Sequence, residues 1–188
     1  PFAMKAQIYT QYGPPSVIRF AEISKPTVGK SDVLIQVKAA TVNRTDSGFR
    51  SAEYFVSRFF SGLFHPNQPV LGCEFAGIVS EIGSEVSRFK VGDRVFGFDD
   101  QGFGGHAEFK VIDENKGITT IPEGLDFETA SALSEGSHYA LGNIRAANVQ
   151  ADQHVLVIGG TGAIGSAAIQ LIKGIGAKVT AVCPGAYM

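Results

Sequence analysis

The sequence contains few cysteines, little charge and no long apolar run. Its two cysteines, Cys73 and Cys183, are too few for a disulfide framework or a four-thiolate zinc site, and they fit a reducing cytoplasm. Only 18% of the residues are charged and the formal net charge is -2, so neither nucleic acid nor an anionic membrane is expected as a partner. The apolar stretch at 155–158 falls far short of the roughly 20 residues of a membrane-spanning helix. We therefore expect a cytoplasmic protein without membrane insertion, whose partner is a small molecule.

Hydrophobic residues account for 44% of the 188 residues, which is enough for a core in one or two globular domains. Up to about residue 121, segments such as 33–39 and 75–83 predict strands separated by glycine-containing turns. After Pro122 the apolar residues are spaced for helices, over 125–133 and 137–148. The sequence predicts an α/β fold with a β-rich N-terminal part, divided into one domain at 4–124 and a second at 125–188.

The second domain contains the pattern of one βαβ unit. Residues 154–158 form a continuous apolar run, which is typical of a strand covered on both faces in a parallel sheet. A helix rich in small residues is predicted over 161–173, and the next strand over 178–183.

The turn between this first strand and the helix has the spacing G-x-G-x-x-G, which in a strand-turn-helix setting indicates dinucleotide binding. Gly160 can form the tight turn, Gly162 leaves room for a pyrophosphate, and Gly165 allows helix and strand to pack closely. The helix N-terminus offers N–H groups and the positive end of its dipole to the phosphates. The alternative is a glycine-rich turn that binds nothing. The predicted cofactor-binding residues of the turn are Gly160, Thr161, Gly162, Ala163, Ile164 and Gly165.

The end of the second strand bears on the choice between NAD(H) and NADP(H). An acidic residue that binds the ribose 2′-hydroxyl is expected about 20 positions after the glycines. This sequence has Val182, Cys183 and Pro184 there, with no carboxylate to repel a 2′-phosphate and no basic or hydroxyl side chain to bind one. The missing carboxylate favours NADP(H) as the cofactor.

Five motifs follow one another between Met4 and Cys183. They are Val42-Asn43-Arg44-Thr45-Asp46, Gly72-Cys73-Glu74-Phe75-Ala76-Gly77, Phe89-Lys90-Val91-Gly92-Asp93-Arg94-Val95-Phe96, Gly104-Gly105-His106-Ala107-Glu108-Phe109 and the glycine turn. Together they resemble the medium-chain dehydrogenase/reductases, and within them the zinc-independent, zeta-crystallin-like quinone oxidoreductases. The resemblance implies a GroES-like, partly open barrel followed by a Rossmann domain, here an incomplete doubly wound parallel sheet, with substrate and nicotinamide meeting between the two.

The resemblance also implies a reaction and its residues. Hydride would pass from NADP(H) to a quinone or an activated enone, while the protein orients and polarises the reactants. Asn43 is the predicted catalytic polar group beside the nicotinamide or the substrate carbonyl, and Tyr54 is a second predicted catalytic residue that contacts the substrate. The aromatic residues near Tyr54 are candidates for the wall of a ring pocket, although such spacing more often marks a helix packed on the core. They are Phe55, Phe59, Phe60 and Phe64.

Two positions depart from the zinc-dependent relatives, which have a ligating cysteine before the Thr-Asp pair and a histidine before the glutamate of the Gly-x-Glu motif. Arg44 and Cys73 occupy these positions and, with Glu74, leave too few ligands for a catalytic zinc, so no metal site is predicted. Tyr139 replaces a threonine that commonly reaches the cofactor in quinone oxidoreductases, and it is a predicted cofactor-binding residue. Asp46 is expected to cap a helix or anchor a turn.

The chain reaches only the second strand of the six that a Rossmann domain contains. We therefore expect a truncated form with reduced or no activity and, from the resemblance, a homo-oligomer in the form of a dimer. Two alternatives remain: a non-catalytic binding or structural protein, as the lens crystallins of this family are, and a regulatory or dimerising fragment.

Overall fold

The computed structural model describes residues 3–187, and the chain divides after Ala132 into two compact units. Each unit has its own sheet and its own hydrophobic core. Met188, the last residue of the predicted second domain, lies outside the described residues. The α/β class with a β-rich first part is confirmed by the order of helices and strands.

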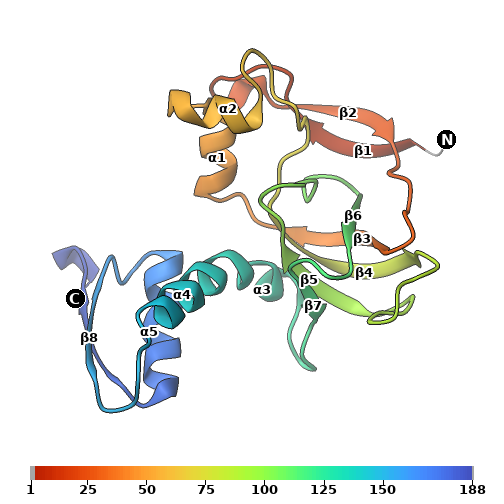
Figure 1. The fold of residues 1–188 in the computed structure, drawn as a ribbon. Helices are drawn as coiled ribbons and strands as arrows, with labels where there is room; N and C mark the ends of the chain where they lie inside the picture. Colours follow the sequence, from red (N-terminus) through yellow and green to blue (C-terminus); the bar gives the residue numbers. More distant parts are fainter. Residues whose placement is uncertain (1–2, 188) are drawn as a thin grey trace. The chain divides into compact units, whose positions relative to one another are not determined.

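The first unit is built around an antiparallel sheet of five strands in the order β6-β3-β4-β5-β7 (Figure 1). The strands are β3 (Asp32–Ala40), β4 (Glu74–Ile82), β5 (Arg94–Phe98), β6 (Phe109–Asp113) and β7 (Ile118–Thr120). Their inward side chains form a core that includes Val33, Ile35, Phe75, Val79 and Val95. Helix α3 (Phe127–Ser131), which begins at the capping residue Asp126, packs against β3, β4 and β5.

A hairpin and two short helices complete the first unit. Strands β1 (Ala3–Ile8) and β2 (Arg19–Ser24) pair with each other, and the 3-10 turn η1 (Pro15–Val17) lies in the loop between them. Strand β1 is also joined to residues 105–108, with Gln7 N donating to His106 O at 2.9 Å. Between β3 and β4 lie α1 (Arg44–Ser51), the 3-10 turn η2 (Phe55–Ser57) and α2 (Arg58–Ser61).

The aromatic segment that follows α1 does not pack on the core, so the expected burial is wrong. Phe55, Phe59, Phe60 and Phe64 are 64%, 68%, 80% and 78% exposed. The elements η2 and α2 are each about one turn long, too short to turn a continuous apolar stripe toward the sheet. The rings of Phe55 and Phe59 instead contact each other edge to face, with centroids 5.8 Å apart.

The second unit contains the predicted βαβ arrangement, preceded by a helix. Its elements are α4 (Ser134–Ala146), β8 (His154–Ile158), α5 (Ala163–Ile175), β9 (Lys178–Val182) and the 3-10 turn η3 (Gly185–Tyr187). Strands β8 and β9 are parallel, with His154 beside Lys178 and Ile158 beside Val182. The two helices pack on this sheet around Ile144, Val157, Ile172 and Ala177.

Strand β8 is covered on one face only within the described residues, whereas its apolar sequence predicts cover on both. Val157 is buried toward the helices, but Leu156 and Ile158 are 60% and 79% exposed. The difference arises because both packed helices of this unit lie on the Val157 face.

A buried ion pair lies inside the first unit. The Lys110 ammonium, whose side chain is only 2% exposed, lies 3.0 Å from Asp99 Oδ2 and also donates to the Phe103 carbonyl. Burial lowers the pKa of Lys110, and the Asp99 carboxylate opposes that shift. Burial alone would raise the pKa of Asp99, but Lys110 and the Gly102 N–H outweigh it and hold that pKa below its ordinary value.

The substitution Asp99→Asn is expected to lower the free energy of unfolding by about 3–5 kcal/mol near pH 7, because it leaves the Lys110 charge buried without its counter-charge. Urea denaturation measures this loss. Asp99 stabilises the fold above its unfolded pKa of about 3.9, and that contribution disappears as the pH falls through the lower folded pKa. The difference between wild type and variant should therefore shrink in acid.

The exposed Lys116, 3.8 Å from Asp99 Oδ1, supplies the control. Lys116→Met should cost less than about 1 kcal/mol. If Asp99→Asn and Lys116→Met lowered the free energy of unfolding equally, the buried pair of Lys110 and Asp99 would not be the main source of the stability.

Candidate functional site

In the first unit, the predicted catalytic residue Asn43 caps helix α1. Its Oδ1 accepts from Asp46 N at 3.0 Å, and Asp46 Oδ2 accepts from Asn43 N at 3.2 Å, which forms a capping box. Asp46 was expected to cap a helix or anchor a turn, and it takes part in this cap as the third residue of α1, while Asn43 is the N-cap residue itself. The sequence folds this way because an asparagine with an acidic residue three positions later satisfies the first N–H groups of a helix.

The other end of the Asn43 amide faces a buried polar cluster. Its Nδ2 donates to Cys73 Sγ at 3.1 Å and to Glu74 Oε2 at 3.3 Å. The Thr41 hydroxyl donates to the same Glu74 oxygen at 2.7 Å. Cys73 is fully buried and Glu74 is 4% exposed. The orientation of the amide is therefore fixed at one end by Cys73 and Glu74, where β4 begins, and at the other by helix α1.

Hydrogen bonds between side chains and backbone hold the segment 41–46 against two other parts of the chain. The His106 ring donates through Nε2 to the Thr41 carbonyl at 2.7 Å, and Gly72 N donates to Asp46 Oδ1 at 2.8 Å. Gly105 N in turn donates to Gly72 O at 2.9 Å. Gly72 has φ +93, and a Cβ there would lie 2.5 Å from His106 N. The chain therefore requires glycine where the three segments meet.

Asn43 was predicted from the sequence as a site residue, whereas the contacts that Thr41, Gly72 and His106 make here were not predicted. Gly72 stands in one of the quoted motifs and has a positive φ that a motif alone does not reveal. His106 also stands in a quoted motif, whereas Thr41 does not, and the sequence gives no signal for their contact, because strand pairing brings them together across 65 residues. Tyr54 lies before η2 with 63% of its surface exposed. The catalytic roles of Asn43 and Tyr54 stay predictions.

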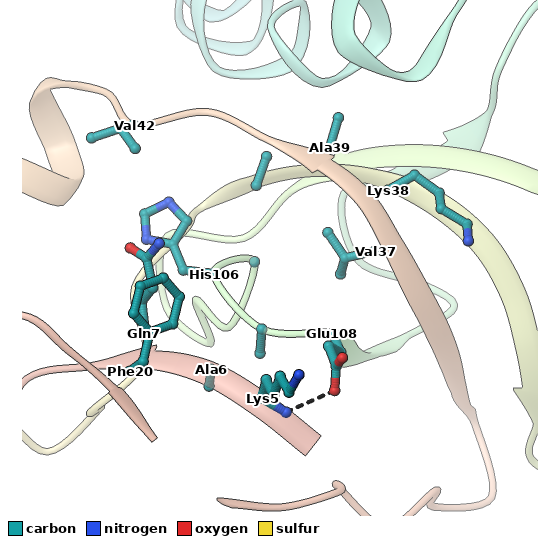
Figure 2. Close-up of a pocket in the computed structure, with 13 residues that line it drawn as sticks. Lys5, Ala6, Gln7, Phe20, Val37, Lys38, Ala39, Val42, His106 and Glu108 are labelled. Atoms are coloured by element: carbon teal, nitrogen blue, oxygen red, sulfur yellow. Dashed lines mark hydrogen bonds between the residues drawn. The ribbon is translucent and has the colours of Figure 1, made fainter. Parts of the chain in front are cut away.

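A groove of about 470 Å³ borders the cluster (Figure 2). It lies between the β1-β2 hairpin and the last part of β3, and the side chains of Gln7, Phe20 and His106 gather on one side of it. Val42 and His106 connect it to the segment 41–46. Neither Asn43 nor Tyr54 lines this groove, so it is separate from the predicted catalytic contacts.

In the second unit, the glycine turn joins β8 to α5 as predicted. The residue with positive φ is Gly159, at +81, so the tight turn falls one position before Gly160, to which the motif assigns it. Gly159 N and Gly160 N both donate to Val182 O, at 3.0 and 3.1 Å, which ties the turn to the end of β9. Gly160 instead packs closely, because a Cβ there would lie 3.0 Å from the Ala181 Cβ.

The other two motif glycines occupy the positions that their predicted roles require. Gly162 is the residue before α5, and a Cβ there would meet only Gly159 O, at 3.5 Å, so the space in front of the helix is open. A Cβ at Gly165 would lie 2.1 Å from Gly159 O, so helix and turn touch. Thr161, Ala163 and Ile164 are exposed beside them. The first N–H groups of α5 have no partners within the helix and can bind an anion.

Tyr139 lies on α4 and is 38% exposed, with its ring edge to face against His138 at 5.3 Å between centroids. Its contact with a cofactor stays a prediction. Among residues 3–187 no three histidine, cysteine or acidic side chains come together as a metal site. None of the described helices is long and apolar enough to cross a bilayer.

Comparisons with known proteins agree with the motifs. The family model of the alcohol dehydrogenase GroES-like domain matches residues 29–123. The quinone oxidoreductase of Sus scrofa is 33% identical and is matched over 90% of this chain and 49% of its own length. The chloroplastic NADPH-dependent alkenal/one oxidoreductase of Arabidopsis thaliana is 31% identical over 92% of this chain and 45% of its length. The solved quinone oxidoreductase of Coxiella burnetii has a TM-score of 0.87 at 31% identity, over 98% of this chain and 58% of that one.

The chain belongs to the medium-chain dehydrogenase/reductase superfamily, in its quinone oxidoreductase branch. The resemblance of the five motifs to this superfamily and to its quinone oxidoreductase branch is thereby confirmed, as are the GroES-like first part and the Rossmann-type second part. The chain spans about half the length of the curated relatives that it matches.

The substitution Gly72→Ala should lower the free energy of unfolding by at least about 3 kcal/mol, because it adds the cost of a left-handed backbone to an overlap with His106 N and Gly105. Gly92→Ala is the matched control, since Gly92 has φ +95 and no atom within 4 Å of a Cβ. The control should cost only about 1–2 kcal/mol. Chemical denaturation compares the two, and similar losses would show that the three segments do not meet as tightly as described.

Proposed function

We propose that the buried polar cluster of the first unit and the glycine turn of the second unit serve an NADP(H)-dependent oxidoreductase that transfers hydride to a quinone or an activated enone without zinc. The observation that carries the proposal is the glycine turn at the N-terminus of α5, tied to the end of β9, in a chain of this superfamily. The relatives support the substrate class, since their names include a quinone oxidoreductase and an alkenal/one oxidoreductase.

The second unit would hold the cofactor. The open space at Gly162 fits a pyrophosphate, because no side chain stands between it and the first N–H groups of α5. These groups and the helix dipole would bind the phosphates, while Gly165 keeps the turn against the helix. Tyr139 is the candidate for a further contact from α4.

The preference for NADP(H) rests on the end of β9. Because Gly159 and Gly160 bond to Val182 O, the residues after Val182 lie beside the turn, where the adenosine ribose of a dinucleotide is bound in this type of fold. Val182, Cys183 and Pro184 carry no carboxylate that would repel a 2′-phosphate. The name of the Arabidopsis thaliana relative, which is NADPH-dependent, supports the same choice.

The first unit would orient the hydride acceptor. A bound NADPH supplies the hydride, and a quinone that takes up this hydride and one proton becomes the hydroquinone. The residues beside the acceptor need only position it and stabilise the negative charge that develops on its oxygen. Asn43 and Tyr54 are the proposed polar groups, and the exposed aromatic side chains near Tyr54 offer apolar surface for a ring.

The substitution Gly162→Val tests the cofactor site. A Cβ at this position would meet only Gly159 O, at 3.5 Å, so folding should be preserved, but NADPH should bind at least about 100-fold more weakly because the side chain fills the pyrophosphate position. Isothermal titration calorimetry on the 188-residue chain measures the affinity, and NADH should bind wild type more weakly than NADPH does. Gly174→Ala, in the same helix and with no atom within 4 Å of its Cβ, is the control and should leave the affinity unchanged. An unaltered affinity in Gly162→Val would refute the site.

The absence of zinc from the proposed reaction is tested by elemental analysis of the purified chain. We expect far less than one zinc per chain, and we expect EDTA to leave NADPH binding unchanged, because Arg44 and Cys73 replace two of the ligands that zinc-dependent relatives use. One tightly bound zinc per chain would overturn this part of the proposal.

A further inference from the structure

We infer that Glu74 is a positioning residue for the acceptor site, acting through Thr41 and Asn43. The inference rests on the proposed function, because it assumes that the segment 41–43 borders the hydride acceptor. The Gly-x-Glu motif does not by itself give Glu74 this role, because in the motif Glu74 is only a residue next to a position that binds zinc in the zinc-dependent relatives. The geometry of the buried cluster points to it.

A single oxygen of Glu74 joins two residues of the segment. Oε2 accepts from Thr41 Oγ1 at 2.7 Å and from Asn43 Nδ2 at 3.3 Å. Hydrogen bonds to an ionised carboxylate are shorter and stronger than neutral ones, and water competes little with a group that is only 4% exposed. The carboxylate thus fixes the chain where β3 ends and α1 begins.

The neighbouring contacts leave the segment few other arrangements. The Thr41 carbonyl is held by the His106 ring, and Asp46 is held by Gly72 N, two residues before Glu74. The Asn43 amide therefore has its oxygen committed to the helix cap and its nitrogen directed toward Cys73 and Glu74. If Glu74 lost its acceptor oxygen, that nitrogen would lose a charged acceptor, and the Cys73 sulfur, a weak acceptor, and the Thr41 hydroxyl at 3.5 Å would be poorer substitutes for it.

Burying a carboxylate is unfavourable unless its partners compensate, and an apolar side chain would fill the same place at lower cost. The cluster lies at the end of the sheet beside exposed Val42, not at the centre of the core formed by β3, β4 and β5. A requirement for one fixed orientation of the segment 41–43 accounts both for the burial of a carboxylate and for its position at the end of the sheet.

The first test needs no turnover. Glu74→Leu removes the acceptor, and the side-chain amide hydrogens of Asn43, followed by NMR, should exchange with solvent about tenfold faster than in wild type. Glu74→Gln keeps one acceptor oxygen, so the exchange rate of the Asn43 amide hydrogens in this variant should lie between those of wild type and Glu74→Leu. Because Glu74→Leu risks misfolding, Thr41→Val and Thr41→Ser form a second pair: the valine removes the hydroxyl with little change of shape, and the serine restores it. Unchanged amide exchange in Thr41→Val and Glu74→Leu would overturn the inference.

The second test uses steady-state kinetics with NADPH and a water-soluble quinone. Thr41→Val should raise the KM for the quinone about tenfold or lower kcat, leave the KM for NADPH unchanged, and be rescued by Thr41→Ser. Ser31→Ala is the matched control, because Ser31 Oγ also donates to a carboxylate, Asp113 Oδ2, at 2.7 Å in the same unit. A control that shifts the quinone KM as much as Thr41→Val would overturn the positioning role. If wild type shows no NADPH-dependent turnover, which agrees with the reduced activity expected of this chain, amide exchange alone decides the inference. The proposed function fails if wild type does not bind NADPH.

Discussion

The first unit depends on the buried carboxylate of Asp46, which joins two segments that are 26 residues apart. One of its oxygens closes the start of α1 and the other holds Gly72 at the start of the β4 region. Because Gly72 is bonded in turn to Gly105, this one side chain sets the position of the loop that carries His106. The polar cluster of Thr41, Asn43 and Glu74 exists only as long as these three segments keep their places.

In the second unit, the glycine turn is held in place by the backbone and hardly at all by side chains. Its turn is defined by Gly159, whose positive φ no larger residue adopts easily, and by two N–H groups that bond to a single carbonyl of β9. The open position at Gly162 and the tight contact at Gly165 then follow from the path of the backbone. The candidate site of the first unit therefore consists of polar side chains in fixed positions, whereas that of the second unit consists of backbone N–H groups.

The sequence predicts those features that have a local cause. The strand at 154–158, the βαβ order and the participation of Asp46 in a helix cap were predictable, because they follow from apolar patterning and from capping chemistry over a few residues. The contact of His106 with Thr41 was not, since it depends on strand pairing over a long separation. The exposure of Phe59 and Phe60 was not either, because one-turn helices carry aromatic residues with the same spacing as buried helices. The shift of the tight turn from Gly160 to Gly159 shows that a motif locates a glycine cluster more reliably than the conformation of each glycine.

The backbone character of the turn at 159–165 has a consequence for protonation. None of its residues carries a group that titrates between pH 5 and 9, and peptide N–H groups keep their protons throughout that range. A phosphate held there would experience the same donors in mildly acidic and mildly alkaline solution. Any variation of the proposed activity with pH must therefore originate from the second ionisation of the 2′-phosphate of NADPH, from the acceptor itself, or from side chains elsewhere in the chain.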